Sequence, residues 1–135
     1  MAGITADHNV EGYFEVLLRV WTSEAWRSIW ESLALEVESF ERLGLPHDAS
    51  DRDLWMMCQQ REIVLLTANR NDEGPESLEA TIRALNEPWS LPVLTIADPE
   101  SVLMSRDYRE RVAIQVLEYL LELDSFRGVG RLFVP

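Results

Sequence analysis

Three polar residues, Asp7, Asp51 and Asn69, stand where folding could bring them together to do chemistry. Asp7 ends a short expected strand, Asp51 opens an expected helix, and Asn69 follows an apolar run typical of a buried strand. Parallel strands end at one edge of a sheet, which is where open α/β sheets bind ligands. Carboxylate and amide oxygens suit Mg²⁺ or Mn²⁺, and such an ion can activate water against a phosphodiester. We therefore expect a divalent-cation pocket at this edge, to which Asp98 could add a further ligand.

The same residues also have structural explanations. A carboxylate at Asp51 would offset the dipole of the helix that it opens, and Asp53 can complete a capping box with Ser50. Asp7 and Asn9 can satisfy free N–H groups at the start of the first helix. The sequence leaves both explanations open for Asp51, whereas the position of Asp7 after a buried strand favours a functional role for it.

Strands alternate with helices along the chain, and this order would position the pocket. Apolar or alternating segments predict strands at 4–7, 35–40, 63–67, 92–96 and 132–134. Helical spacing of apolar residues predicts helices at 10–20 and after the capping residues Thr22–Ser23, Ser50 and Ser105, with another starting near Pro75. We predict a three-layer α/β sandwich with a largely parallel sheet of about five strands. The strand order stays open.

Composition restricts the function further. The 135 residues fit one domain spanning 1–135, and 47% of them are apolar, which is ample for a core. The net charge of −12 argues against non-specific binding to nucleic acid. Every basic residue is arginine, which excludes lysine chemistry, and the single Cys58 excludes an internal disulfide. With no signal-peptide pattern and no apolar run near the ~20 residues that span a bilayer, we expect a soluble, cytoplasmic protein that does not contact the membrane.

Three short motifs resemble those of the small PIN-like domain family, many of whose members occur in toxin–antitoxin gene pairs. They are Asp7-x-Asn9, then Ser50-Asp51 followed two residues later by a hydrophobic pair, and Leu65-Leu66-Thr67-x-Asn69-x-Asn71. The resemblance covers roughly the first half of the chain, and its matched positions are Asp7, Asp51 and Thr67. It implies a metal-dependent ribonuclease-like fold, with RNA as the substrate and an antitoxin-like protein or a second copy of the chain as partner.

The resemblance, taken together with the residues, assigns expected roles. Asp7 and Asp51 would be catalytic, and with Asn69 they would hold Mg²⁺ or Mn²⁺. The substrate would lie against Asn9, Thr67, Arg70 and Asn71. Arg70 would either pair with a phosphate in bidentate fashion or neutralise one of the two acids.

Two amides, Asn69 and Asn71, stand where typical members of the family carry acids. An amide oxygen can coordinate a metal but brings no charge, so divalent-cation binding would be weakened. The sequence thus predicts a PIN-like domain whose ribonuclease site could be degenerate. The alternative is a non-catalytic PIN-like interaction domain, acting as a homodimer or with a partner protein through exposed residues such as Trp89. A nucleotide or small-molecule sensor is a third class, disfavoured by the lack of a glycine-rich phosphate loop.

Overall fold

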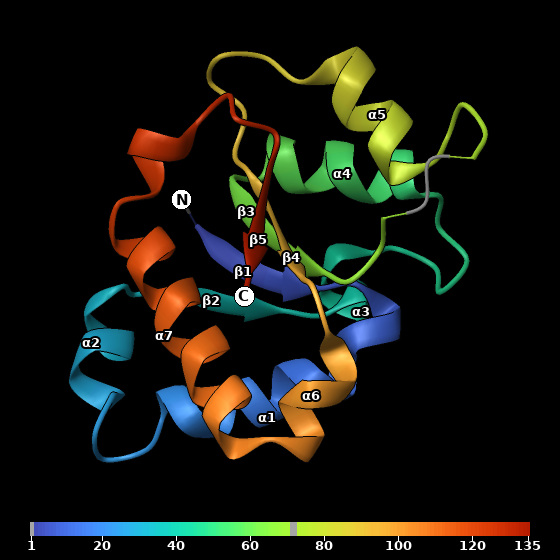
Figure 1. Ribbon diagram of the computed structural model, residues 1–135. Coiled ribbons are helices and arrows are strands. Elements are labelled where there is room, and N and C mark those ends of the chain that lie inside the picture. Colours follow the sequence, from blue (N-terminus) through green and yellow to red (C-terminus); the bar gives the residue numbers. More distant parts are fainter. Residues whose placement is uncertain (1, 71–72) are drawn as a thin grey trace.

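The computed structural model describes residues 2–70 and 73–135 as an α/β fold built on an all-parallel sheet (Figure 1). The strands are β1 (Gly3–Ala6), β2 (Glu36–Glu38), β3 (Ile63–Thr67), β4 (Val93–Ile96) and β5 (Arg131–Val134). The α-helices are α1 (Glu11–Trp21), α2 (Arg27–Ser32), α3 (Phe40–Leu43), α4 (Asp51–Gln60), α5 (Leu78–Leu85), α6 (Pro99–Met104) and α7 (Arg106–Leu121). Short 3₁₀ helices cover His8–Val10 and Leu123–Phe126.

The sheet has the strand order β2-β1-β3-β4-β5, and all neighbours are parallel. Ala6 pairs with Leu66, and Thr67 pairs with Thr95, so β1, β3 and β4 end at the same edge. Close packing of the first two strands requires glycine at position 3, because a Cβ there would lie 2.6 Å from the carbonyl oxygen of Glu36. The prediction of a mainly parallel sheet of about five strands is confirmed.

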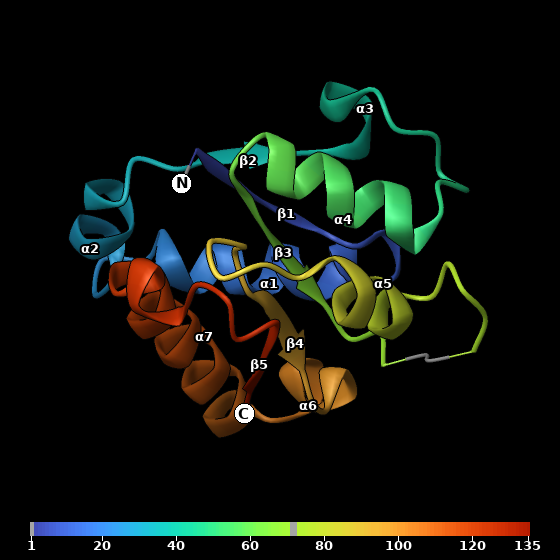
Figure 2. The same ribbon diagram turned by 90° about the horizontal axis from the view of Figure 1, so that it is seen from above.

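Helices cover both faces of the sheet and enclose two hydrophobic cores (Figures 1 and 2). One face packs against α1, α2, α6 and α7 through alternate strand residues that include Ile4, Val64, Leu66 and Leu94. The other face packs against α3, α4 and α5 through Ile63, Leu65 and Val93. Successive side chains of a strand point to opposite faces, which explains why the central run at 63–67 is continuously apolar. This arrangement gives the three layers expected from the sequence.

Several predicted boundaries were wrong, because local capping decides where helices begin. Thr22 and Ser23 do not cap α2, since their hydroxyls donate back to the carbonyls of Leu18 and Val20 at the end of α1. The strand predicted at 35–40 ends at Glu38, where the next residue caps the short helix α3. The fifth helix begins at residue 78 rather than near Pro75, because the side chain of Ser77 is its cap. Helices α3 and α6 were not predicted.

Candidate functional site

The register of the sheet places Asp7 beside Thr67. The backbone N–H of Asp7 donates to the carbonyl of Leu66 at 2.8 Å. The hydroxyl of Thr67 then donates to Oδ2 of Asp7 at 2.9 Å. Both side chains are buried. Burial raises the pKa of the Asp7 carboxyl, and the charge of Asp51 raises it further, against the opposing effect of the Thr67 hydrogen bond and of nearby backbone N–H groups.

Asp51 occupies the first turn of α4, after the capping residue Ser50. Its Oδ2 accepts two hydrogen bonds, from Nδ2 of Asn69 at 2.9 Å and from the backbone N–H of Leu78 at 3.1 Å. Leu78 is the first residue of α5, where backbone N–H groups lack helical partners. Asp51 therefore joins α4 to the loop after β3 and to the start of α5.

A hydrogen-bonded chain connects the two acids. The backbone N–H of Asn69 donates to Oγ1 of Thr67 at 2.9 Å, so the links run from Asp7 through Thr67 and Asn69 to Asp51. Asp7, Thr67 and Asn69 border a hollow of about 470 Å³, which Asn9 also lines, together with Val10, Tyr13, Ala68 and Pro99. The structure thus brings together five of the residues singled out in the sequence, at the edge where β1 and β3 end.

Arg70 and Asp98 form their hydrogen bonds outside the polar cluster. Nη2 of Arg70 donates to the carbonyl of Ala97 at 3.0 Å, and its guanidinium lies 5.8 Å from the centre of the Phe133 ring. Among the described residues it forms no ion pair, so the neutralising role expected for it is not seen. Asp98 accepts a hydrogen bond from the hydroxyl of Ser101 at the start of α6. The expected substrate contact Asn71 lies outside the described residues.

Arg131, on β5, has a positioning role that the sequence analysis missed. Its Nη1 donates to the carbonyl of Asn69 at 2.8 Å and to the hydroxyl of Thr95 at 2.7 Å. Its Nη2 pairs with Glu79 of α5 at 3.2 Å, and only 8% of the arginine side chain is exposed. The available signal was an arginine directly before the apolar run predicted as a strand at 132–134, since a buried guanidinium needs partners. Arg131 fixes the backbone of the loop that carries Asn69.

The donor set does not fit a closed metal centre. Within residues 2–70 and 73–135, no group of three or more His, Cys, Asp or Glu side chains could hold a metal ion. Asn69 turns its amide nitrogen, a donor, toward Asp51. One oxygen of each acid, Asp7 and Asp51, is already engaged in hydrogen bonds. The arrangement is a hydrogen-bonded polar cluster beside a hollow.

Comparison with family models, with curated proteins and with solved structures finds no match for this chain. No helix of the described part of the chain is long and apolar enough to cross a membrane. The geometry of the polar cluster is therefore the basis for assigning a function.

Proposed function

We propose that this chain is a PIN-like domain with a degenerate ribonuclease site, which acts by binding rather than by metal-dependent cleavage of RNA. The observation that carries the proposal is the 2.9 Å hydrogen bond from Nδ2 of Asn69 to Oδ2 of Asp51. An acid at position 69 would face Asp51 as a like charge and would need a cation between them. The amide closes the same gap with a hydrogen bond, so the site holds together without an ion.

Two carboxylates remain from the set that the resemblance implies. Mg²⁺ is often held in proteins by one or two carboxylates with several waters, so Asp7 and Asp51 would be the residues to bind it or Mn²⁺. A bound ion of this kind would supply an activated water. Asn9 and Thr67 lie on the wall of the adjoining hollow, where a nucleic-acid substrate would contact them. With an amide as the third group, the expected affinity for divalent cations is low.

The experiment combines calorimetry of Mn²⁺ and Mg²⁺ binding with cleavage of an end-labelled single-stranded RNA. The proteins are the native chain, Asn69→Asp, the double variant Asn69→Asp/Asn71→Asp, and Asp7→Asn in both the native and the Asn69→Asp backgrounds. Gln115→Glu is the matched control, because it makes the same amide-to-acid change on α7, away from the hollow. We expect weak metal binding and no cleavage by the native chain. Asn69→Asp should bind Mn²⁺ at least about tenfold more tightly, and Asp7→Asn should remove that gain.

Two outcomes would contradict the proposal in different ways. Metal-dependent cleavage by the native chain, abolished by Asp7→Asn, would show that the amide is an adequate ligand and that the site is an active ribonuclease. No gain in metal affinity from either restored acid would show that the cluster is purely structural. In the second case the PIN-like resemblance would no longer support a metal-binding site, although the description of the fold would be unchanged.

Binding without catalysis requires a contact surface, and Trp89 supplies its most exposed aromatic side chain. The Trp89 side chain is 66% exposed, which agrees with its position in a proline-flanked loop. Its carbonyl accepts a hydrogen bond from Arg127 at 2.7 Å, and the amide of Gly128 donates to the carbonyl of Ser90, so two loops meet at this corner. Val129, in the second loop, is also exposed. A partner protein or a second copy would bury this corner, and Trp89→Ala should weaken that association in sedimentation experiments.

A further inference from the structure

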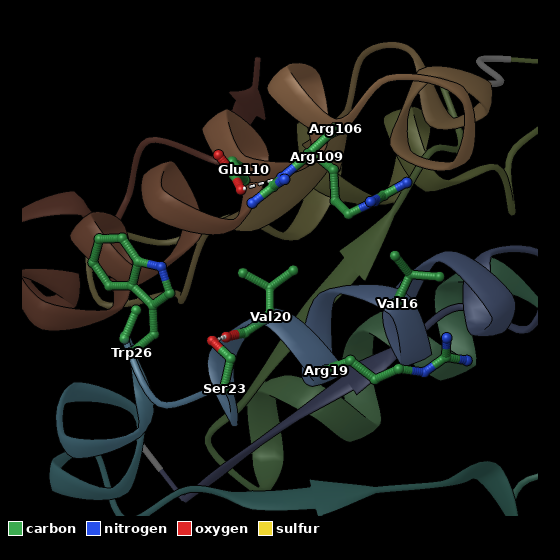
Figure 3. A pocket seen from close by; sticks show the side chains of 9 residues that line it. Val16, Arg19, Val20, Ser23, Trp26, Arg106, Arg109 and Glu110 are labelled. Carbon is green, nitrogen blue, oxygen red and sulfur yellow. Dashed lines mark hydrogen bonds and ion pairs between the residues drawn. The ribbon is translucent and has the colours of Figure 1, made fainter.

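A second hollow, of about 500 Å³, lies between α1 and α7, and its lining is rich in arginine (Figure 3). Arg19 comes from α1, whereas Arg106 and Arg109 come from α7 together with Glu110. The whole chain carries 12 arginines and 24 acidic residues, which gives a net charge of −12. The four charged side chains here leave a local net charge of +2. A positive hollow in so acidic a chain points to an anionic ligand.

The three arginines differ in how far they are already engaged. Arg109 donates to the carbonyls of Val102 and Leu103 at 2.8 and 3.0 Å, which anchors it over the end of α6. Arg106 pairs with Glu110 at 3.0 Å, but 85% of its side chain is exposed, and an exposed pair of this kind adds little stability. Among the described residues, Arg19 makes no hydrogen bond or ion pair. Arg19 can therefore bind an anion without giving up any existing contact.

The remaining walls of the hollow are largely apolar and include an aromatic ring. Val16 and Val20 line its floor on α1, and half-buried Trp26 closes one end (Figure 3). Trp26 stands at one end of the hollow, Arg106 lies near its middle, and the guanidinium groups of Arg19 and Arg109 lie toward the other end (Figure 3). A ligand with a flat ring on Trp26 would extend along the hollow to bring an anionic group to these arginines. The volume falls in the range of roughly 300–1,000 Å³ that is typical of small-molecule sites.

We propose that this hollow binds a nucleoside monophosphate. A phosphate monoester carries about −1.5 to −2 charges at neutral pH, which matches the local +2 better than a single carboxylate would. A compact ligand is favoured over a nucleic-acid strand. Its phosphate lies within the screening length of ~8 Å from the arginines, whereas a strand would place further phosphates beyond that distance, over the surface of a chain with a net charge of −12. The lining residues of this hollow and of the hollow beside Asp7 do not overlap. The proposal is thus independent of the nuclease-like site.

The test measures binding of AMP by calorimetry in EDTA, so that no divalent cation can contribute at Asp7. Adenosine and inorganic phosphate serve as the two half-ligands, and a ten-nucleotide oligoadenylate serves as the extended one. We expect AMP to bind at least about tenfold more tightly than either half-ligand. Arg19→Gln, which removes one charge-assisted contact, and Trp26→Leu, which removes the stacking ring, should each weaken AMP binding by about tenfold. Arg61→Gln, which removes another exposed charge at the end of α4 on the other face of the sheet, and Asp7→Asn should leave AMP binding unchanged.

Each other outcome would overturn the proposal. No AMP binding at millimolar concentration, or equal binding of adenosine, would show that the hollow is not a phosphate site. A loss of affinity in Asp7→Asn but not in Arg19→Gln would move the ligand to the other hollow. Tighter binding of the oligoadenylate, with the same dependence on Arg19, would make the hollow part of a nucleic-acid path. If Trp26→Leu fails to fold by circular dichroism, the exposed Arg19→Gln variant decides the matter alone.

Discussion

Asn69 and Asp51 are joined by a 2.9 Å hydrogen bond in which the amide nitrogen donates to a carboxylate oxygen. The same oxygen accepts the backbone N–H of Leu78 at 3.1 Å. One carboxylate oxygen of Asp51 therefore accepts hydrogen bonds both from a side-chain amide and from the backbone N–H at the start of α5. Position 69 requires a donor in the metal-free protein, which is a structural reason for asparagine there.

The change Asn69→Asp should destabilise the metal-free protein. It replaces a donor with a second carboxylate facing Asp51, so a hydrogen bond is lost and a like-charge contact is created. We expect the free energy of unfolding to fall by about 2 kcal/mol in EDTA and to recover when Mn²⁺ is added, because binding to the folded state alone is stabilising. Urea denaturation at pH 7 with and without Mn²⁺ measures both effects. Gln115→Glu should show neither, and an Asn69→Asp variant as stable as the native chain in EDTA would refute this account of the amide.

The change Asp7→Asn should stabilise the protein at neutral pH. The pKa of Asp7 is raised in the folded state, first by burial and then by the charge of Asp51. The folded chain therefore holds this proton more tightly than the unfolded chain, and stability falls as pH rises from the ordinary carboxyl pKa through the raised one. Asparagine has no charge to desolvate, and its carbonyl oxygen can still accept the Thr67 hydroxyl.

Thermal unfolding of native and Asp7→Asn proteins between pH 3.5 and 7.5 tests this sign. The variant should have the higher Tm at pH 7, and the difference should shrink as pH falls toward the ordinary carboxyl range. Asp48→Asn is the control, because it makes the same chemical change at an exposed carboxylate. A lower Tm for Asp7→Asn at pH 7 would mean that the charge itself is stabilising and that the pKa is not raised.

Most of the fold could be predicted from the sequence because its signals are local. The run at 63–67 is apolar at every position, and this pattern is typical of a strand buried on both faces. Strand order could not be predicted, because the placement of β1 between β2 and β3 depends on packing between residues far apart in the sequence. Helices α3 and α6 were missed because their four and six residues are too few to show a clear helical period.

The candidate site was predicted in part for a similar reason. Asp7, Asp51 and Asn69 could be grouped because parallel strands end at one edge of a sheet. The direction of the Asn69 amide could not be predicted, because the carbonyl of the same residue is held by Arg131 from a strand more than sixty positions away. The partner of Arg70 could not be predicted either. Its position in the loop suggested a phosphate or one of the two acids, but the side chain donates to the Ala97 carbonyl and lies over the Phe133 ring.

The change Arg131→Met should destabilise the protein more strongly than any surface arginine change. It removes the hydrogen bonds to Asn69 and Thr95 and leaves Glu79, only 26% exposed, without its cation. Breaking a buried pair in this way costs about 3 kcal/mol. Urea denaturation measures the loss, with Arg83→Met as the control, because Arg83 is an exposed arginine on α5. A double-mutant cycle with Glu79→Gln should show coupling of about 1 kcal/mol or more, whereas strict additivity would mean that the ion pair does not stabilise the fold.

Cys58 should be inert toward thiol reagents in the folded protein. Burial raises the pKa of this thiol to about 12, with a further contribution from the charge of Asp7. Since the thiolate is the reactive form, only about one molecule in ten thousand would carry it at pH 8. The side chain is also 1% exposed, on the inner face of α4.

Reaction with Ellman's reagent at pH 8 should therefore be slow for the native chain and complete within seconds in 8 M urea. The Asp7→Asn variant should react no faster than the native chain, because burial is the larger cause of the raised pKa and the variant leaves burial unchanged. Asp7→Asn is also predicted to be more stable, so any opening of α4 that exposes the thiol should become rarer rather than more frequent. Rapid labelling of the folded native chain would show that α4 detaches from the sheet, and with it the Asp51 carboxylate that holds the polar cluster together.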